Sequence, residues 1–407
     1  MLNTSFELPC GAVIPNRLVK AAMTERLSNT KFEPTAAHEH LYCRWAGTGT
    51  GLQITGNVII DRVHLESAGN VAFDDDGMLP KLQSWAKAAQ HTGNPCWVQI
   101  SHAGRQANRF STLRPKAPSA VQLQKLGLFG RPVPMTEEDI QEVIAGFVQA
   151  AKLAQAAGFS GLQIHSAHGY LLSQFLSPLT NQRNDQWGGS LENRSWLLLQ
   201  VVKEVRAAVG ASYPISVKLN SADFQRGGFS EEESIEVVKM LDTAGIDLLE
   251  ISGGTYEKLA FFLMNDESSN LRESTRQREA YFIDFARKVR AVSKVPLMIT
   301  GGFRSRAFCE EVLEKGEVDL IGMARPFITN VNEIASFLSG ETAVLENLVI
   351  RTGLAALEDA AEGGFYARQL IRLAEGQEVN PGMNPIWAAN FLIIHELKKA
   401  LTRRLGL

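Results

Sequence analysis

The sequence predicts an α/β protein that folds as a single (β/α)8 TIM barrel with a helical C-terminal extension. Eight short apolar runs, rich in β-branched residues, recur through residues 1–340. Amphipathic runs with apolar residues three and four apart separate them, which is the pattern of surface helices. The junctions AAGFSGLQI, TAGIDLLEI and EKGEVDLIG share one order: helix end, glycine, short turn and buried strand. A doubly wound open sheet would show the same alternation, but the count of eight favours a closed barrel.

The strands are expected where an apolar run is short and bounded by glycine, proline or polar residues. They are 17–23, 52–60, 95–100, 161–165, 214–219, 247–251, 296–300 and 318–322. Helices are expected between them. The run 137–157 has acids in its first turn and Gly158 as its stop, and Ser190 is expected to cap the next helix. The runs 231–244 and 279–292 repeat the pattern.

The size and composition fit a large core. The chain has 407 residues, of which 45% are hydrophobic. Residues 1–340 show no domain boundary and are expected to form the barrel. Residues 341–407 are polar and helical in pattern, and we expect this extension to pack on the barrel or on a neighbouring subunit.

Charge and cysteine usage argue against several classes of protein. Lysine and arginine number 41 and the acids 44, without a basic block, so nucleic acid is not an expected partner. No uncharged apolar stretch approaches the roughly 20 residues that cross a bilayer, and no secretory signal is evident. The four cysteines are scattered and form no CxxC, which predicts reduced thiols in a cytoplasmic protein.

The chemistry of such a barrel is expected at the C-terminal ends of its strands. The seventh strand runs into Gly301 and Gly302, and the eighth runs into Gly322-Met323-Ala324-Arg325. Glycine lets backbone N–H groups approach an anion, and arginine offers a fork of donors, so these two loops predict a phosphate site. The run GTGTG at 47–51 follows a helical pattern and precedes a strand, the reverse of a dinucleotide-binding fingerprint.

The stretch HSAHGY, residues 165–170, carries a pair of histidines at the end of the fourth strand. The pair could bind a metal, could be structural, or could hold negative charge. A metal site would need a third ligand, for which His102, with Asp223 behind it, is the best candidate. Residues three apart in a strand point to opposite faces, so the two rings converge only if the chain turns, which Gly169 permits.

Five segments together resemble the old yellow enzyme family, the FMN-dependent ene-reductases that are also called NADH:flavin oxidoreductases. They are PNRLVKAAMTE, VQISHAGRQA, HSAHGYLLSQFLSPLTNQRNDQWGGSLENR, SVKLNSADF and GGF…GMARPF. The resemblance covers residues 5–335, and 165–194 is its most specific part. It implies an FMN-holding barrel in which NADPH or NADH reduces the flavin and leaves. An α,β-unsaturated carbonyl compound then occupies the same pocket and takes hydride at its β-carbon.

The resemblance also implies roles for individual residues. His165 and His168 would hold the oxygen of the developing enolate, and Tyr170 would protonate the α-carbon, although solvent could replace it. The residues expected at the cofactor are Thr24 at a flavin carbonyl, Ala22 and Met23 along the ring, Gly56 and Gln99 at the pyrimidine side, Lys218 beside the flavin, and Gly301, Gly302, Ala324 and Arg325 around the phosphate.

Three departures from the family pattern bear on the site. Many members have arginine where this chain has Lys218, which keeps the positive charge but loses the bidentate geometry. Thr24 stands where some relatives carry cysteine, and Ala324 where glycine is common. The absence of a cysteine cluster argues against the iron–sulfur dienoyl-CoA reductase branch.

Several alternatives stay open. The same flavin could reduce or demethylate other electrophiles, such as nitro compounds or quinones, or could be bound without useful turnover. From another class, His165, His168 and His102 could form the centre of a metal-dependent barrel hydrolase or lyase.

Two features outside the strand ends complete the expectations. Residues 101–136 are too long for an ordinary βα loop and are expected to cover the pocket, with Phe110, Leu128 and Phe129 shaping access. Trp187 is expected to pack the loop before the following helix.

Assembly is open as well. Relatives are often homodimers or homotetramers, and in some a C-terminal arginine reaches the neighbour's pocket. Arg403 and Arg404 are the candidates for that role.

Overall fold

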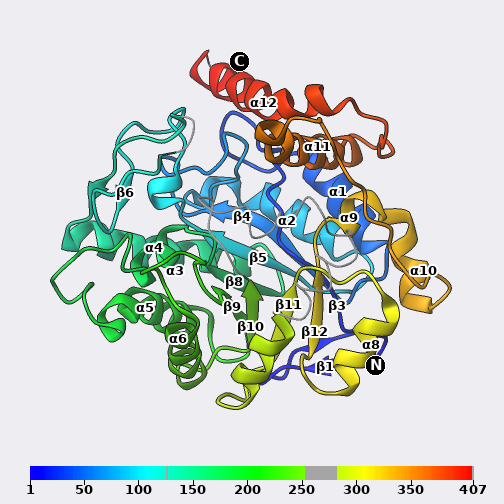
Figure 1. Ribbon diagram of the computed structural model, residues 1–407, viewed down its shortest axis with the longest axis horizontal. Coiled ribbons are helices and arrows are strands. Elements are labelled where there is room, and N and C mark those ends of the chain that lie inside the picture. The colour runs from blue at the N-terminus through cyan, green and yellow to red at the C-terminus, as the bar shows by residue number, and fades with distance from the viewer. Residues whose placement is uncertain (125–126, 253–281, 406–407) are drawn as a thin grey trace.

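The computed structural model describes residues 1–124, 127–252 and 282–405, and eight of its strands close into one barrel (Figure 1). The strands are β3 (Leu18–Lys20), β4 (Leu52–Ile59), β5 (Cys96–Ser101), β8 (Gly161–Ser166), β9 (Ile215–Asn220), β10 (Leu248–Ser252), β11 (Leu297–Thr300) and β12 (Leu320–Met323). Each pairs in parallel with its neighbours in chain order, and β12 returns to β3. The expected (β/α)8 barrel is confirmed.

The helices cover the outside of the barrel. They are α1 (Ala36–Ala46), α2 (Leu79–Ala89), α3 (Glu137–Ala156), α4 (Leu171–Leu176), α5 (Leu191–Val209), α6 (Glu231–Thr243), α8 (Arg306–Glu314), α9 (Pro326–Thr329), α10 (Ile334–Ser339), α11 (Ala355–Ala374) and α12 (Pro385–Leu405). Residues 282–290 are also helical, while 279–281 lie outside the described residues. Ser190 caps α5 as expected, because its side chain accepts the backbone N–H of Asn193.

Shorter elements fill the remaining connections. They are β1 (Phe6–Glu7), β2 (Val13–Ile14), β6 (Lys116–Ala117) and β7 (Val133–Pro134), with single 3-10 turns at Asp76–Met78, Gly104–Gln106 and Val331–Glu333. The β1–β2 hairpin lies at the N-terminal end of the barrel, where Leu8 and Ile14 pack into the small inner core.

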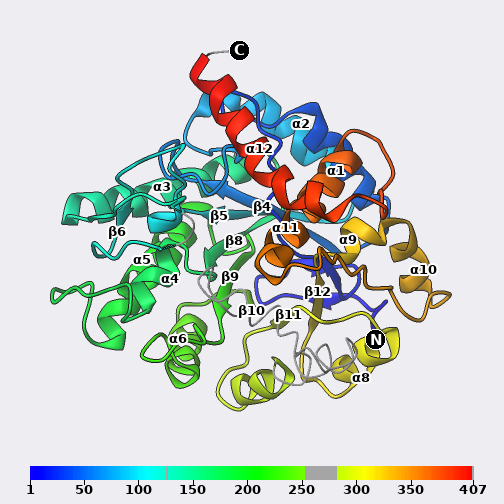
Figure 2. The same cartoon turned by 45° about the horizontal axis from the view of Figure 1, so that its top comes forward.

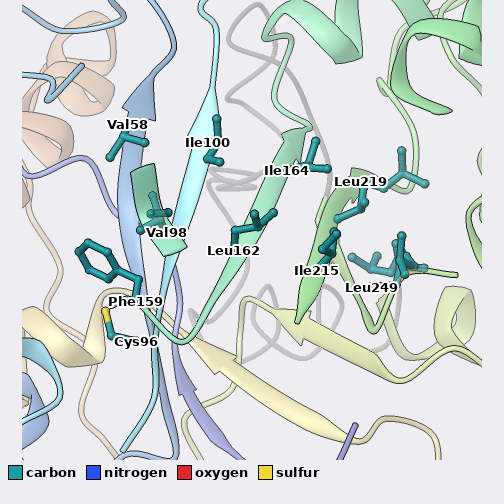
Figure 3. Packing of buried hydrophobic residues seen from close by; sticks show 14 of the residues in the cluster. Val58, Cys96, Val98, Ile100, Phe159, Leu162, Ile164, Ile215, Leu219 and Leu249 are labelled. Atoms are coloured by element: carbon teal, nitrogen blue, oxygen red, sulfur yellow. The ribbon is translucent and has the colours of Figure 1, made fainter. Parts of the chain in front are cut away.

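Two layers of side chains follow from the alternation of residues along each strand. Residues that point outward, such as Val98, Leu162 and Ile215, form the main core beneath the helices (Figure 3). Residues that point inward change from apolar to polar from the N-terminal to the C-terminal ends of the strands. An apolar set lies toward the N-terminal ends and includes Val19, Trp97, Leu248, Met298 and Leu320. Buried polar side chains take the next inward positions, which places the polar layer toward the catalytic end.

Two strands differ from the expectation in their bounds. The predicted strand 17–23 pairs only over Leu18–Lys20. The predicted strand 318–322 runs instead over Leu320–Met323. Just before it, the carboxylate of Asp319 accepts the backbone N–H of Leu297 at 2.7 Å. In β4 the register shifts between Ile54 and Asn57, which is a bulge beside the site.

The expected helical extension is present and consists of α11 and α12. In Figure 1, α12 lies along the upper edge of the molecule, outside α11, and the turn to Figure 2 brings it to the front. The boundary at residue 340 as a domain division stays a prediction. None of the helices in the described part of the chain is long and apolar enough to cross a membrane. Cys10, Cys43, Cys96 and Cys309, which all lie in the described ranges, form no disulfide with one another.

Candidate active site

The two histidines of HSAHGY come together at the end of β8. His165 is the last inward-facing residue of the strand, and the chain then turns so that the two ring centroids lie 5.2 Å apart. The sequence pointed to Gly169 as the residue that permits the turn, and Gly169 does have φ +75°. The left-handed backbone begins one residue earlier, at His168, which has φ +61°. A left-handed backbone at a non-glycine residue is strained and persists only where neighbours hold it.

Three side chains that sequence reasoning missed hold His168 in this conformation. Its backbone N–H donates to Asn220 Oδ1 at 3.0 Å, and its carbonyl accepts from Gln106 Nε2 at 2.8 Å. Its ring Nε2 lies 2.7 Å from Ser252 Oγ. Asn220 and Ser252 end β9 and β10, so the same alternation that turns His165 inward could have identified them.

The proton of His165 lies on Nε2. The backbone N–H of Ala167 donates to Nδ1 at 3.2 Å, so Nδ1 keeps its lone pair and Nε2 carries the hydrogen. Burial holds the pKa of His165 well below its ordinary value, and the neighbouring His168 and Lys218 lower it further. Burial and Lys218 do the same to the pKa of His168. Both rings are therefore neutral at pH 7.

Tyr170 lies against the edge of His165. The two ring centroids are 4.8 Å apart at an angle of 78°, and the tyrosine is buried under Ala103 and Ala107. These alanines begin the 101–136 segment, so that segment covers Tyr170. The structure thus brings the three residues predicted to be catalytic into one group.

Lys218 belongs to a buried chain of polar side chains across the barrel. Its Nζ lies 2.8 Å from Glu250 Oε1, and the two residues pair directly in the β9–β10 register. Gln163 Nε2 donates to Glu250 Oε2 at 2.8 Å, and Gln99 Nε2 donates to Gln163 Oε1 at 2.7 Å. Sequence reasoning found Gln99 and Lys218 but missed Gln163 and Glu250. The alternation of residues along the run DLLEI, which turns Glu250 toward the inside of the barrel, could have identified it.

The loop after β3 contacts the bulge in β4. Thr24 Oγ1 donates to Asn57 Oδ1 at 2.8 Å, and the backbone N–H of Gly56 donates to the buried Glu25 carboxylate at 2.8 Å. A Cβ on residue 56 would lie 2.1 Å from Glu25 Oε2 and 2.3 Å from Met23 O, so only glycine fits. Ala22 and Met23 are partly buried beside it. Contacts of these residues with a flavin stay predictions.

The expected phosphate end combines two glycines with two arginines. Gly301 and Gly302 have φ of +131° and +83°, a backbone that other residues rarely adopt. Arg325 Nη1 lies 2.6 Å from Glu362 Oε1 of α11. Burial and the positive charge of Arg325 lower the pKa of Arg304 to about 10. Arg304, two residues after Gly302, was not singled out from the sequence.

A second histidine pair surrounds Asp61 beside the ends of β4 and β5. Asp61 Oδ2 lies 2.9 Å from His64 Nδ1 and 3.1 Å from His102 Nε2. The opposite ring nitrogens accept backbone N–H groups, from Lys116 at 3.0 Å and Gly104 at 2.9 Å. Each ring therefore directs its hydrogen at Asp61. Burial raises the pKa of Asp61, but the hydrogen bonds from the two rings outweigh it and hold the pKa well below its ordinary value.

This arrangement bears on the metal alternative. Asp61, His64 and His102 are the one group of three potential metal ligands found within the described ranges. His102 stacks on His64 with centroids 4.3 Å apart and does not join His165 and His168. With the donor hydrogens of both rings on the Asp61 side, the group forms a hydrogen-bonded clamp in which neither ring directs a lone pair at the centre.

The Asp61 clamp anchors the 101–136 segment to the loop after β4. Within that segment the backbone N–H of Arg109 donates to Leu128 O at 2.9 Å. Asn108 and Phe129 form an isolated antiparallel β-bridge. Phe110, Leu128 and Phe129 are all partly buried; their effect on access stays a prediction.

Trp187 packs the loop before α5, as expected. Its side chain is buried, and its Nε1 donates to Glu137 Oε2 at 2.6 Å.

Comparisons with known proteins address the family. A model of the NADH:flavin oxidoreductase / NADH oxidase family matches residues 11–337. The NADH-dependent flavin oxidoreductase iccE of Talaromyces variabilis is 36% identical over 352 residues, which cover 81% of this chain and 84% of that protein. The NADH-dependent flavin oxidoreductase iliE of Neonectria sp. is 36% identical over 345 residues, 79% of this chain. The match covers only 45% of that longer relative.

Solved structures share the fold. A 2-naphthoyl-CoA reductase in complex with 2-naphthoyl-CoA has a TM-score of 0.79 at 23% identity, covering 96% of this chain and 58% of that one. An old yellow enzyme homologue from Zymomonas mobilis has a TM-score of 0.71 at 23% identity, covering 85% of this chain and 95% of that one. At these identities the likeness is one of fold.

Proposed function

The chain belongs to the NADH:flavin oxidoreductase / NADH oxidase family, the old yellow enzyme family that its motifs resemble, and we propose that it is an FMN-dependent ene-reductase. The family cofactor is FMN, with NADH or NADPH as the reductant. The proposed substrate is an α,β-unsaturated carbonyl compound that is reduced at its C=C bond. The observation that carries the proposal is the pair of buried, neutral imidazoles at the end of β8.

The residues present suit FMN at both of its ends. At the phosphate end, Arg304 and Arg325 are close enough for one guanidinium to lower the pKa of the other, and a phosphate would relieve that repulsion. The left-handed backbone at Gly301 and Gly302 leaves no Cβ in the way of an anion. At the ring end, the buried ammonium of Lys218, held in place by Glu250, provides a donor within the polar layer.

Bound FMN, once reduced by NADH or NADPH, supplies the hydride that the β-carbon of the substrate receives. Negative charge then develops on the carbonyl oxygen. His165 Nε2–H is a donor to which no described residue offers an acceptor, and His168 stands beside it. Each hydrogen bond to a charged oxygen contributes about 1.5–3 kcal/mol, so two would accelerate the step by about 10²–10⁴.

Tyr170 is proposed as the proton donor to the α-carbon. The phenol is protonated at neutral pH because the ordinary pKa of tyrosine is about 10. The contact of its ring with His165 supports this role, and Ala103 and Ala107 cover the tyrosine.

The direct test is anaerobic mixing of the flavin-loaded protein with NADH and then with cyclohexenone, followed by flavin absorption. We expect NADH to bleach the flavin and cyclohexenone to restore it with formation of cyclohexanone. Tyr170→Phe should slow the second half-reaction by up to about 10²-fold, because solvent then delivers the proton. Its reoxidation by a quinone, which needs no protonation of carbon, serves as the matched control.

Three results would change the assignment. A protein that binds no FMN and oxidises neither NADH nor NADPH would contradict it. If the protein reduced quinones or nitro compounds rapidly but accepted no activated alkene, its function would be the reduction of those electrophiles and not of enones. FMN binding without turnover of any acceptor would make the chain a flavin-binding protein.

A further inference from the structure

Helices α11 and α12 pack against each other (Figure 2), and α12 also docks onto the loop after β3. Lys399 Nζ donates to the carbonyl of Ser28. One turn later on the same helix, Arg403 donates to the carbonyl of Asn29 at 3.3 Å. Two cations of α12 therefore face the backbone of this loop.

A cavity of about 530 Å³ lies between α11, α12 and this loop. Its apolar wall consists of Ile371, Trp387, Phe391 and Ile394. Trp387 is 51% exposed and Ile394 is 47% exposed, so the cavity opens to solvent at this wall. The residues that line it are separate from those assigned to FMN and to the substrate. A cavity with an apolar wall and a few polar groups is the usual form of a small-molecule site.

The polar wall of the cavity carries an excess of positive charge. The charged residues that line it are four cations, Arg368, Lys398, Lys399 and Arg403, and one acid, Glu375. Glu375 pairs with Arg368 at 3.3 Å, so this acid is already used. The other three cations have no carboxylate partner within the part of the chain that the structure describes.

The nearest further acid on α12 faces away from these cations. Glu396 accepts the backbone N–H of Ala68 at 2.6 Å and pairs with Arg26 at 3.3 Å. His395, which also lines the cavity, adds no charge at pH 7, because burial and the neighbouring Lys399 lower its pKa to about 4. The excess of positive charge in the cavity therefore stays uncompensated.

The cations lie close enough to act on one another. Burial lowers the pKa of Lys399 to about 8, and the charge of Arg403 adds to the effect. Burial also lowers the pKa of Arg403 to about 10. The guanidinium of Arg403 is fixed over the ring of Phe32 at 3.7 Å from its centroid, so it does not swing away from Lys399. An anion between the two groups would relieve this repulsion.

Two buried donors at the cavity have no hydrogen-bond partner within the described ranges. Ser28 is 1% exposed, lines the cavity, and its Oγ is unpaired. The Nε of Arg403 is also buried and unpaired. A buried donor without an acceptor is destabilising, so most such donors in proteins are paired. An acceptor that enters with a ligand would satisfy both.

We propose that this cavity binds an organic phosphate, which is a phosphate monoester attached to an apolar or aromatic body. A phosphate monoester carries about 1.5–2 negative charges at pH 7 and three acceptor oxygens. Its charge matches Lys398, Lys399 and Arg403, and its oxygens accept from the unpaired donors. Trp387 and Phe391 pack against the body.

This site lies apart from the proposed ene-reduction and does not depend on it. A free phosphate ester and the headgroup of a lipid both present the required chemistry, and the experiment separates them. A carboxylate, with one charge and two oxygens, is the weaker ligand.

Isothermal titration of the FMN-loaded protein with phenyl phosphate tests the site. We expect saturable binding of one equivalent. Inorganic phosphate lacks the body and benzyl alcohol lacks the charge, so each should bind at least about 10-fold more weakly. Because neither reductant nor acceptor is present, the result is independent of turnover.

The variant Lys398→Glu places a carboxylate at the cavity. Lys398 is exposed and its side chain forms no hydrogen bond within the described chain, so the fold should be unaffected. The Kd for phenyl phosphate should rise about 10-fold or more. Lys203→Glu, at an exposed lysine of α5 outside the cavity, is the matched control and should leave the Kd unchanged. Far-UV circular dichroism verifies that both variants are folded.

The variant Ser28→Ala separates binding from packing. It removes a hydroxyl without a partner, so the thermal stability should not fall, while the Kd for phenyl phosphate should rise about 10-fold. Ser166→Ala removes another buried and unpaired hydroxyl, at the end of β8, and should leave the Kd unchanged. A hydroxyl that only fills space would give the same Kd in wild type and Ser28→Ala.

Two outcomes would overturn the proposal. One is a wild type that binds no phenyl phosphate. The other is binding that is equally tight in wild type, Lys398→Glu and Ser28→Ala, which would place the ligand elsewhere.

Vesicles identify the source of the phosphate. Co-sedimentation with phosphatidic acid vesicles but not with phosphatidylcholine vesicles, lost in Lys398→Glu, would support a lipid headgroup. Binding of phenyl phosphate without co-sedimentation would support a free phosphate ester.

Discussion

The two histidine pairs at the catalytic end of the barrel differ in the charge that they face. His64 and His102 both direct a hydrogen at the Asp61 carboxylate, and backbone N–H groups occupy their other nitrogens. His165 also accepts a backbone N–H, but the fixed charge that acts on its pKa is the cation Lys218, which is paired with Glu250. The first pair already holds its anion, and the second is prepared to receive one. Residue type alone therefore does not assign a role to a histidine pair; its neighbours do.

The largest effect on stability is expected when the carboxylate that pairs with Lys218 beside the second histidine pair is removed. Glu250→Gln leaves a buried ammonium without its partner, and we expect the free energy of unfolding to fall by about 3–5 kcal/mol. Urea denaturation measures this change. Glu236→Gln, which breaks an exposed pair with Lys239, is the control and should lose less than about 1 kcal/mol. Equal losses in the two variants would mean that the buried pair does not fix the polar layer.

An intermediate effect is expected at Asp61. Asp61→Asn replaces an acceptor for two ring N–H groups with an amide that also donates, so the variant should lose about 1.5–3 kcal/mol of stability. Its affinity for phenolates should change little, because the proposed function assigns the phenolate oxygen to His165 and His168. A large loss of phenolate affinity without a loss of stability would reverse the roles of the two pairs.

The smallest effect concerns pH. The pKa of His165 is lower in the fold than its ordinary value of about 6.5, so the unfolded chain binds the proton more readily. This contribution to stability is complete above about pH 6.5 and is lost as the pH falls toward the folded pKa. His165→Asn should reduce the slope of unfolding free energy against pH between 6.5 and 4.5 by up to about 1.4 kcal/mol per pH unit. Thermal unfolding measured across that pH range tests this prediction. An unchanged slope would mean that the His165 ring is protonated in the folded protein.

The sequence was sufficient for the barrel and for part of the site. Each strand is a short apolar run with a clear boundary, so the eight strands and their order could be read directly. The histidine pair was found because it stands at the end of the fourth strand, and Lys218 was found through the family resemblance. Glu250 was missed because a carboxylate within DLLEI was read only as part of a strand, and its meaning depends on Lys218 across the register.

Other features could not be read from the sequence at all. Asp61 and His102 are 41 positions apart and meet only through the packing of two loops. The left-handed backbone at His168 depends on Asn220 and Gln106, which lie on other elements. The periodicity of α12 predicted a helix but not which face would dock.

The most direct measurement is the binding of 4-hydroxybenzaldehyde, a phenolate-forming ligand, to the flavin-loaded protein. Flavin absorption reports it, and 4-methoxybenzaldehyde, which cannot form the anion, is the matched ligand. The wild type should bind the phenol far more tightly than the ether. His165→Ala/His168→Ala should lose that difference while NADH still reduces the flavin. An unchanged preference for the phenolate in the double variant would contradict the assignment of these two histidines as the holders of the oxyanion.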